Sequence, residues 1–186
     1  MSAGRWLETD GTRWLFDAGA DCLDFTTGPD ADLAGWLCTR FPRLDPAEVG
    51  ERELVDARSL RDAIGRMAVA AADGDRADPD DVDTVNLFAA TPDVPPALPG
   101  GRRHAGAARI RVAQALSSLA RDAVAVFADT GSGRLRRCAA ADCRRVFHDE
   151  SRTINRRWCS MQRCGNRAKV RAYRERAGLA ERDGHF

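Results

Sequence analysis

Four cysteines in the C-terminal part of the chain have the spacing of a metal site. Cys138 and Cys143 form one pair and Cys159 and Cys164 the other, with four residues inside each pair and fifteen between the pairs. Two close pairs joined by one spacer are typical of structural zinc sites, because each tight turn supplies two thiolates and the spacer lets the second turn fold back. We expect the four sulfurs to surround one Zn²⁺ at ~2.3 Å. His148 is an alternative ligand, but the matching spacings favour the four cysteines.

The expected zinc site is structural. A catalytic zinc keeps one position open beside three protein ligands, and four cysteines leave none open. The chain also lacks the Pro-Cys-x-x-Cys motif of zinc deaminases, a P-loop, a G-x-G-x-x-G loop and a G-x-S-x-G elbow. Asp24, Asp149 and the other acidic residues form no catalytic constellation. We therefore expect a protein that is not an enzyme.

The residues around the cysteines extend the pattern. Phe147, Asp149 and Ser151 make a Phe-x-Asp-x-Ser segment, residues 156–161 read Arg-Arg-Trp-Cys-Ser-Met, and residues 164–167 read Cys-Gly-Asn-Arg ahead of a basic segment. This combination resembles the CGNR zinc finger. The resemblance implies a small zinc-binding fold that acts as a DNA-binding module.

Two elements must position the second pair of cysteines. Residues 145–148 and 156–159 are expected to pair as a hairpin over the metal, and a helix is expected from Cys164 to about Ala177. A knuckle, a hairpin and a helix that carries the last ligand describe a treble-clef-like module. The positive end of the helix dipole favours a thiolate at Cys164.

The expected C-terminal helix has two stripes. Val170, Tyr173 and Ala177 form an apolar stripe, which we expect to pack on the hairpin beside Trp158. Three arginines fall within about 60° of one another on the adjacent face and would be presented to a partner. The predicted nucleic-acid contacts are Arg156, Arg157, Arg167, Lys169, Arg171 and Arg174.

Structural roles stay open for three of these arginines. Arg167 can bond a carboxylate such as Asp149, and either Arg156 or Arg157 can stack on Trp158. In each case the guanidinium would stabilise the module instead of meeting a phosphate.

The charge of the chain is divided unevenly. Residues 134–186 hold 15 Lys+Arg and 6 Asp+Glu, a balance of +9, whereas residues 1–133 hold 14 basic and 22 acidic residues, a balance of −8. Zinc bound by four thiolates would leave the basic part at about +7. A basic module on an acidic body is typical of a nucleic-acid-binding protein. The open alternative is a basic tail that neutralises its own partner domain.

The N-terminal part is predicted to be mainly helical with a small β element. Asp10 and Gly11 mark a turn between two alternating segments, which predicts a short hairpin near the N-terminus. Asp-Pro pairs at Asp45 and Asp78 supply a helix cap and a proline at the first position. The predicted helices cover residues 30–41, 50–72, 78–88 and 110–129, and the loop 91–106 contains Arg102, Arg103 and His104.

The run Cys22-Leu23-Asp24-Phe25, taken with the CGNR-like tail, resembles the opening of the ABATE domain. In that family the Leu-Asp-Phe run usually leads into an Asn-Thr pair, whereas Thr27-Gly28 follows here. The resemblance implies a stress-linked transcription regulator. Cys22 and Cys38 lie in apolar contexts and are predicted to be buried free thiols outside the metal site.

The expected organisation is a helical domain over 1–130, a Gly-Ser linker at 131–134, a zinc finger over 135–180 and a tail at 181–186, with separate cores in the two domains. No apolar run approaches the ~18 residues of a membrane span, and residues 1–12 lack a signal-peptide core. We expect a cytoplasmic, zinc-dependent, DNA-binding transcriptional regulator. A small-molecule ligand, a protein partner and a homodimer stay open for the N-terminal domain. The alternative function is a zinc-stapled module that binds protein or RNA.

Overall fold

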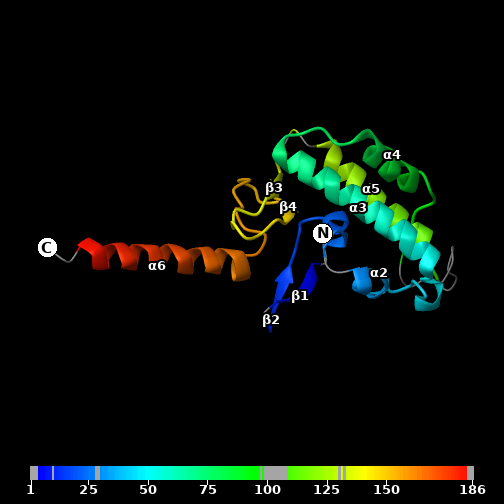
Figure 1. Ribbon diagram of the computed structural model, residues 1–186. Helices are drawn as coiled ribbons and strands as arrows, with labels where there is room; N and C mark the ends of the chain where they lie inside the picture. The colour runs from blue at the N-terminus through cyan, green and yellow to red at the C-terminus, as the bar shows by residue number, and fades with distance from the viewer. Residues whose placement is uncertain are drawn as a thin grey trace.

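The computed structural model describes residues 4–9, 11–27, 30–96, 98, 109–129, 131 and 133–183. Three longer helices lie side by side in the body, and a short hairpin and the N-terminal helices lie beside them (Figure 1). The cysteine-bearing module lies against the body, and a last helix extends away from it as a single rod (Figure 1). None of the described helices is both long and apolar enough to span a membrane.

Local sequence signals mark two helix starts and one helix end. The Asp45 carboxylate accepts a hydrogen bond from the Ala47 N–H, and Asp78 does the same for Asp80, so both Asp-Pro pairs cap a helix. Gly74 ends the longest helix with a left-handed φ of 80°. The helices are α1 (Asp21–Phe25), α2 (Leu33–Arg40), α3 (Glu51–Asp73), α4 (Pro79–Ala89), α5 (Val112–Ala128) and α6 (Asn166–Asp183), with 3-10 turns at Asp30–Asp32 and Pro46–Glu48.

The core of the body lies between α1, α3, α4 and α5. Leu60 and Ile64 on α3 and Leu116 on α5 are buried along one stripe of each helix, as a 3.6-residue period requires. Short helix α1 inserts Leu23 and Phe25 into the same core. Each such side chain contributes roughly 1.5–3 kcal/mol by leaving water.

The N-terminal hairpin places two aromatic rings in the core and two apolar side chains in solvent. Strands β1 (Arg5–Thr9) and β2 (Thr12–Phe16) pair antiparallel, as the turn at Gly11 predicts. Trp14 and Phe16 are buried on the inner face, whereas Trp6 and Leu15, which oppose each other, are exposed on the outer face. The alternation of a strand therefore leaves an aromatic outer face on this hairpin.

The C-terminal module contains a different hairpin from the predicted one. Strand β3 (Leu135–Arg137) pairs antiparallel with β4 (Val146–His148), whereas residues 156–159 form no strand. The predicted pairing of 145–148 with 156–159 was wrong. The turn that carries the first two cysteines reverses the chain directly after β3, so β3 becomes the nearest partner of β4.

The module and the body share one hydrophobic core. Leu135 and Phe147 belong to the same buried cluster as the helices. The His148 N–H donates to the Ala18 carbonyl at 2.7 Å, and Arg137 on β3 pairs with Asp73 at the end of α3. The expectation of separate cores was therefore wrong, because β3 and β4 pack directly on α3.

Gly19 permits this close approach. It has φ of 80°, and a Cβ there would lie far inside van der Waals contact with the His148 carbonyl oxygen. Gly74 has the same φ, but a Cβ there would meet nothing within 4 Å.

We predict that Gly19→Ala destabilises the protein much more than Gly74→Ala. Both substitutions incur left-handed backbone strain of about 1–2 kcal/mol, and Gly19→Ala adds overpacking of about 1–3 kcal/mol against β4. Urea denaturation of the two variants measures the difference. Equal losses would show that the module is not held against Gly19.

Candidate metal centre

The four cysteine sulfurs form one compact cluster. All four Sγ atoms lie within 4.8 Å of one another. The Sγ of Cys159 is 3.7 Å from that of Cys143 and 3.6 Å from that of Cys164. A tetrahedron with metal–sulfur arms of ~2.3 Å has edges of about 3.8 Å, so this donor set fits a four-coordinate metal ion. His148 is not part of the cluster.

Backbone hydrogen bonds position the sulfurs. The Cys138 N–H donates to the Arg145 carbonyl at 2.9 Å, and the Cys143 N–H donates to Ala140 at 2.9 Å, which closes the first turn. The Cys159 N–H donates to the Sγ of Cys138 at 3.4 Å, which joins the two pairs. These hydrogen bonds close the first turn and link it to the second pair.

The fourth cysteine lies in a π-helical turn, Met161–Gly165, directly ahead of α6. The Ser160 hydroxyl accepts from the Arg163 N–H at 3.4 Å and caps this turn. Cys164 is fully buried there. A π-helical turn is wider than an α-helical one, and here the Cys164 sulfur points inward while α6 continues outward. Cys164 therefore both joins the cluster and fixes the start of α6.

The thiols do not ionise equally. Hydrogen bonding with the Cys159 thiol, more than the opposing burial, lowers the pKa of Cys143 to about 4. The same contact, together with burial and the neighbouring negative sulfurs, raises the pKa of Cys159 well above its ordinary value. Burial likewise raises the pKa of Cys164. A bound cation removes this conflict, because it compensates the charge of all four thiolates.

Two arginines reduce the negative charge of the cluster. Arg145 lies 3.9 Å from the Sγ of Cys143, and Arg167 lies 3.6 Å from the Sγ of Cys164. Four thiolates around a divalent ion carry a net charge of −2, so these outer donors stabilise the loaded site.

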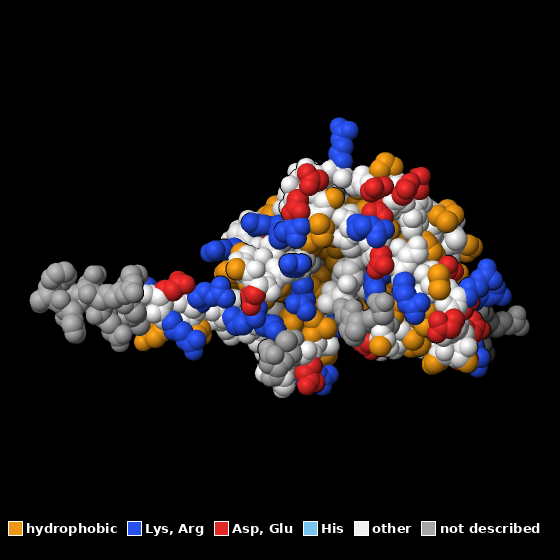
Figure 2. Space-filling view, in the orientation of Figure 1, with side chains coloured by type: hydrophobic (Ala, Val, Ile, Leu, Met, Phe, Trp, Pro, Cys, Tyr) orange, Lys and Arg blue, Asp and Glu red, His pale blue; other side chains and the backbone are white. Residues whose placement is uncertain are grey.

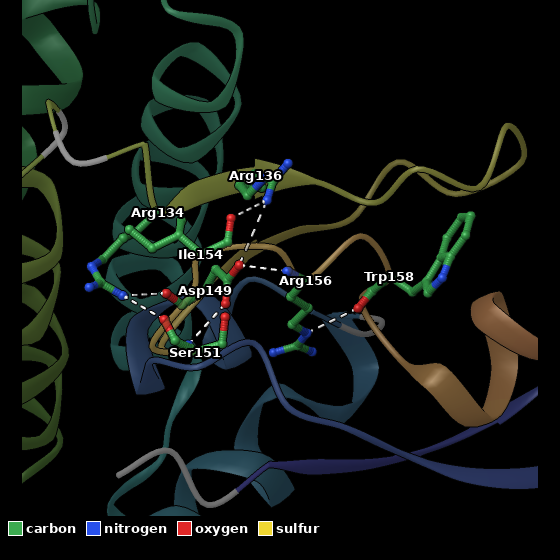
Figure 3. Close-up of polar contacts among 7 residues, drawn as sticks. All are labelled: Arg134, Arg136, Asp149, Ser151, Ile154, Arg156 and Trp158. Carbon is green, nitrogen blue, oxygen red and sulfur yellow. Dashed lines mark hydrogen bonds and ion pairs between the residues drawn. The ribbon is translucent and has the colours of Figure 1, made fainter.

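A buried carboxylate orders the loop between the two pairs (Figure 3). Asp149 is fully buried and accepts hydrogen bonds from the backbone N–H groups of Ser151 at 3.0 Å and Arg156 at 2.8 Å. Arg136 lies 3.8 Å from the same carboxylate. Burial acts to raise the pKa of Asp149, but the hydrogen bonds from Ser151 and Arg156 and the charge of Arg136 outweigh it and lower the pKa.

The loop itself is held from both sides. Arg134 donates to the Asp149 carbonyl at 2.8 Å, and Arg136 donates to the carbonyl of Ile154 at 2.9 Å (Figure 3). Ile154 has a left-handed φ of 46°, which a β-branched residue adopts only when its surroundings impose it. The Phe-x-Asp-x-Ser segment thus fixes the path of the chain toward Cys159.

Two family models match successive parts of the chain. Residues 134–177 match the family model of the CGNR zinc finger, and residues 6–130 match the ABATE model, described as "Putative stress-induced transcription regulator". The chain belongs to the ABATE family. The CGNR finger follows the ABATE domain, as the two resemblances predicted. No curated protein matches the chain significantly.

Arg156 and Arg157 of the CGNR finger have different surroundings. The Arg156 guanidinium donates to the carbonyls of Trp158, Asp17 and Cys159 and lies 4.4 Å over the Phe147 ring. Arg157 is exposed and stacks over Trp158 at 5.0 Å, which is one of the two stacking arrangements expected. Arg156 therefore joins the finger to the ABATE domain. The guanidinium of Arg157 stacks on Trp158 on one face and stays exposed to solvent.

Arg167 pairs with Asp142 at 2.8 Å and not with Asp149. Asp142 lies in the turn between the first two cysteines, so the ion pair links that turn to α6. Asn166 donates to the Gln162 carbonyl at 3.0 Å within the turn that leads into α6.

The apolar stripe of α6 is not packed as predicted. Val170 is 49% exposed and Tyr173 is 68% exposed, so neither packs on a hairpin beside Trp158. The reason is that α6 leaves the finger as a rod (Figure 1). Lys169, Arg171 and Arg174 are exposed along it. The side chain of Ala177 and the residues Arg102, Arg103 and His104 lie outside what the structure describes.

We predict that the purified protein holds one equivalent of metal and that Cys159→Ser releases it. Metal binding at such sites supplies roughly 10 kcal/mol or more. Because the finger shares its core with the ABATE domain, metal loss should lower the unfolding temperature of the whole chain. Elemental analysis and thermal circular dichroism measure both effects. A metal content below about half an equivalent in the native protein would contradict the prediction.

A second prediction concerns the two cysteines outside the cluster. Cys22 is buried in the ABATE core and Cys38 is half-buried on α2. The double variant Cys22→Ala/Cys38→Ala should keep its full metal content and lose only packing energy. Cys159→Ser serves as the comparison. Metal loss in the double variant would mean that the ligand set differs from the cluster.

Proposed function

We propose that the protein is a cytoplasmic, zinc-dependent, DNA-binding transcriptional regulator and not an enzyme. The observation that carries the proposal is α6, a basic helix that begins at a buried cysteine cluster and extends away from the body (Figure 1). Arg171 and Arg174 are exposed on it, and among the described residues no ion pair involves either side chain. Such a helix is suited to meet phosphates.

Zinc is the proposed ion. Four thiolates in a tetrahedral arrangement select zinc or an iron–sulfur cluster, and the family of the finger is a zinc finger. The closed set of four protein ligands supports a structural ion, because a catalytic zinc needs a free position for water or substrate. The ion would hold the turn of Cys138 and Cys143 against the start of α6.

Charge supports DNA as the partner. The +9 balance of residues 134–186 faces a −8 balance in the rest of the chain. Lys and Arg side chains gather over the finger and along the described part of α6 (Figure 2). A polyanion would be attracted to this part of the molecule and repelled from the acidic body. The protein would therefore bind DNA in one orientation.

The ABATE domain is proposed to sense a ligand or partner. A cavity of about 630 Å³ lies between α3, α4 and α5. Its wall includes Met67, Val85 and Phe127, and Gly131 of the linker closes one side. This volume suits a small, mainly apolar molecule. A ligand there would contact both the ABATE core and the segment that leads to the finger.

The alternative function is a zinc-stapled module that binds another protein or RNA. The exposed Val170 and Tyr173 favour it, because an apolar stripe on a free helix can seat in a protein groove. The two functions differ in their dependence on salt and on duplex DNA.

We predict that Arg171→Ala/Arg174→Ala weakens DNA binding and its salt dependence. If about four phosphates are contacted, log affinity should fall against log salt with a slope of about −3.6. The double variant should reduce the magnitude of that slope by up to about 2, since each arginine releases about one counterion. Fluorescence anisotropy with a labelled duplex between 50 and 200 mM salt measures it.

Zinc content and the far-ultraviolet circular dichroism of the double variant serve as controls for its fold. Unchanged affinity and slope in a folded, zinc-loaded double variant would reject DNA binding by α6. That result would favour the protein-interaction function.

A further inference from the structure

The arginine stripe of α6 faces a groove. Arg167, Arg171 and Arg174 line one side of it together with Val170, and Thr12 to Trp14 of the N-terminal hairpin line the other. The groove has a volume of about 620 Å³. A phosphate bound on the groove side of the stripe would lie in a space bordered by β2.

The groove carries a strong positive charge. Among the residues that the structure describes, five arginines line it and Glu175 supplies the one carboxylate of the lining. Asp142 pairs with Arg167 at 2.8 Å and neutralises part of the charge at that position. A surface of this composition binds a chain of repeated negative charges better than a single small anion. The five arginines are Arg13, Arg163, Arg167, Arg171 and Arg174.

The hairpin side of the groove is preorganised. The Arg13 guanidinium lies 4.7 Å over the ring of Trp6, whose side chain is 57% exposed on the outer face of the hairpin. Stacking on an aromatic ring restricts the guanidinium while its N–H groups stay free to donate in its plane. On the inner face of the hairpin, the buried Trp14 ring is covered by Arg145 and Arg163, each at 5.1 Å. The floor of the groove is thus fixed by packing.

We propose that the β1–β2 hairpin is a second DNA-binding element, and that the sugar–phosphate backbone of one strand lies in the groove between this hairpin and α6. Arg13 contacts a phosphate on the hairpin side while Arg171 and Arg174 contact phosphates on the helix side. The inference rests on the proposed function and adds the ABATE domain to the DNA-binding surface. An acidic protein segment is the competing occupant.

The spacing of phosphates favours DNA over an acidic segment. The stripe repeats every three to four residues, which separates successive arginines by roughly 4.5–6 Å along α6. Successive phosphates on one strand have a regular spacing, whereas carboxylates on a disordered segment have no fixed spacing. The groove thus matches a regular polyanion.

The test compares variants on the two sides of the groove in the full-length, zinc-loaded protein. Arg13→Ala removes the hairpin cation, and Thr12→Glu places a negative charge in the same wall. Arg52→Ala on α3 is the matched control, because Arg52 is exposed and does not line the groove. The probe is a labelled duplex of about two helical turns, and polyglutamate of similar charge is the competitor.

Arg13→Ala should weaken duplex binding about 8-fold at 0.1 M salt and reduce the magnitude of the salt slope by about 0.9, as expected for one lost phosphate contact. Thr12→Glu should weaken binding at least as much, and Arg52→Ala should leave the slope unchanged. Thermal unfolding checks that the hairpin variants fold.

If Arg13→Ala and Thr12→Glu behave like Arg52→Ala while Arg171→Ala/Arg174→Ala lowers the slope, the groove inference fails and the proposed function stands. If none of the variants changes duplex binding, both fail. Polyglutamate that displaces the duplex at equal charge concentration would assign the groove to an acidic protein segment instead and overturn the inference.

Discussion

The structure of the C-terminal part depends on bringing four sulfurs within 4.8 Å of one another. These sulfurs come from the end of β3, the turn after it, the end of the long loop and the start of α6. Each segment alone is too short to bury a core of its own. The cluster therefore sets where the loop between Cys143 and Cys159 ends and where α6 begins. Asp149, with Arg134, Arg136 and Arg156 around it, fixes the path of this loop toward the cluster.

The position of the finger is also fixed by its contacts with the ABATE domain. Because β4 lies directly on Gly19 and Phe147 fills the shared core, the finger cannot shift without breaking contacts in the body. The Arg156 guanidinium also donates a hydrogen bond to the backbone carbonyl of Asp17. The position of the finger is therefore tied to the helices of that domain by packing, which a flexible linker alone would not do.

Local signals in the sequence predicted most of this fold. The cysteine spacing identified the cluster because coordination geometry acts over a few residues, and the Asp-Pro pairs marked helix starts because caps are local. Pairings over longer distances were harder to predict. The strand that pairs with β4 and the carboxylate that pairs with Arg167 both depend on how the turn of Cys138 and Cys143 folds. The hydrophobic periodicity of the sequence does not predict the fold of that turn. The stripe of Val170 and Tyr173 satisfied an amphipathic pattern, but a pattern does not say whether a packing surface lies within reach.

The free course of α6 has a consequence for its own stability. Helix initiation is costly, and an isolated helix near this length is marginal in water because each residue gains little after the first turn forms. Here the first turn is imposed from outside by the buried Cys164 and the Ser160 cap. The buried Cys164 thus fixes the first turn of α6, and a metal ion held by the four cysteines would add to this fixation. The fully formed helix is roughly 27 Å long, so an ion bound at its base would support its reach as well as its anchorage.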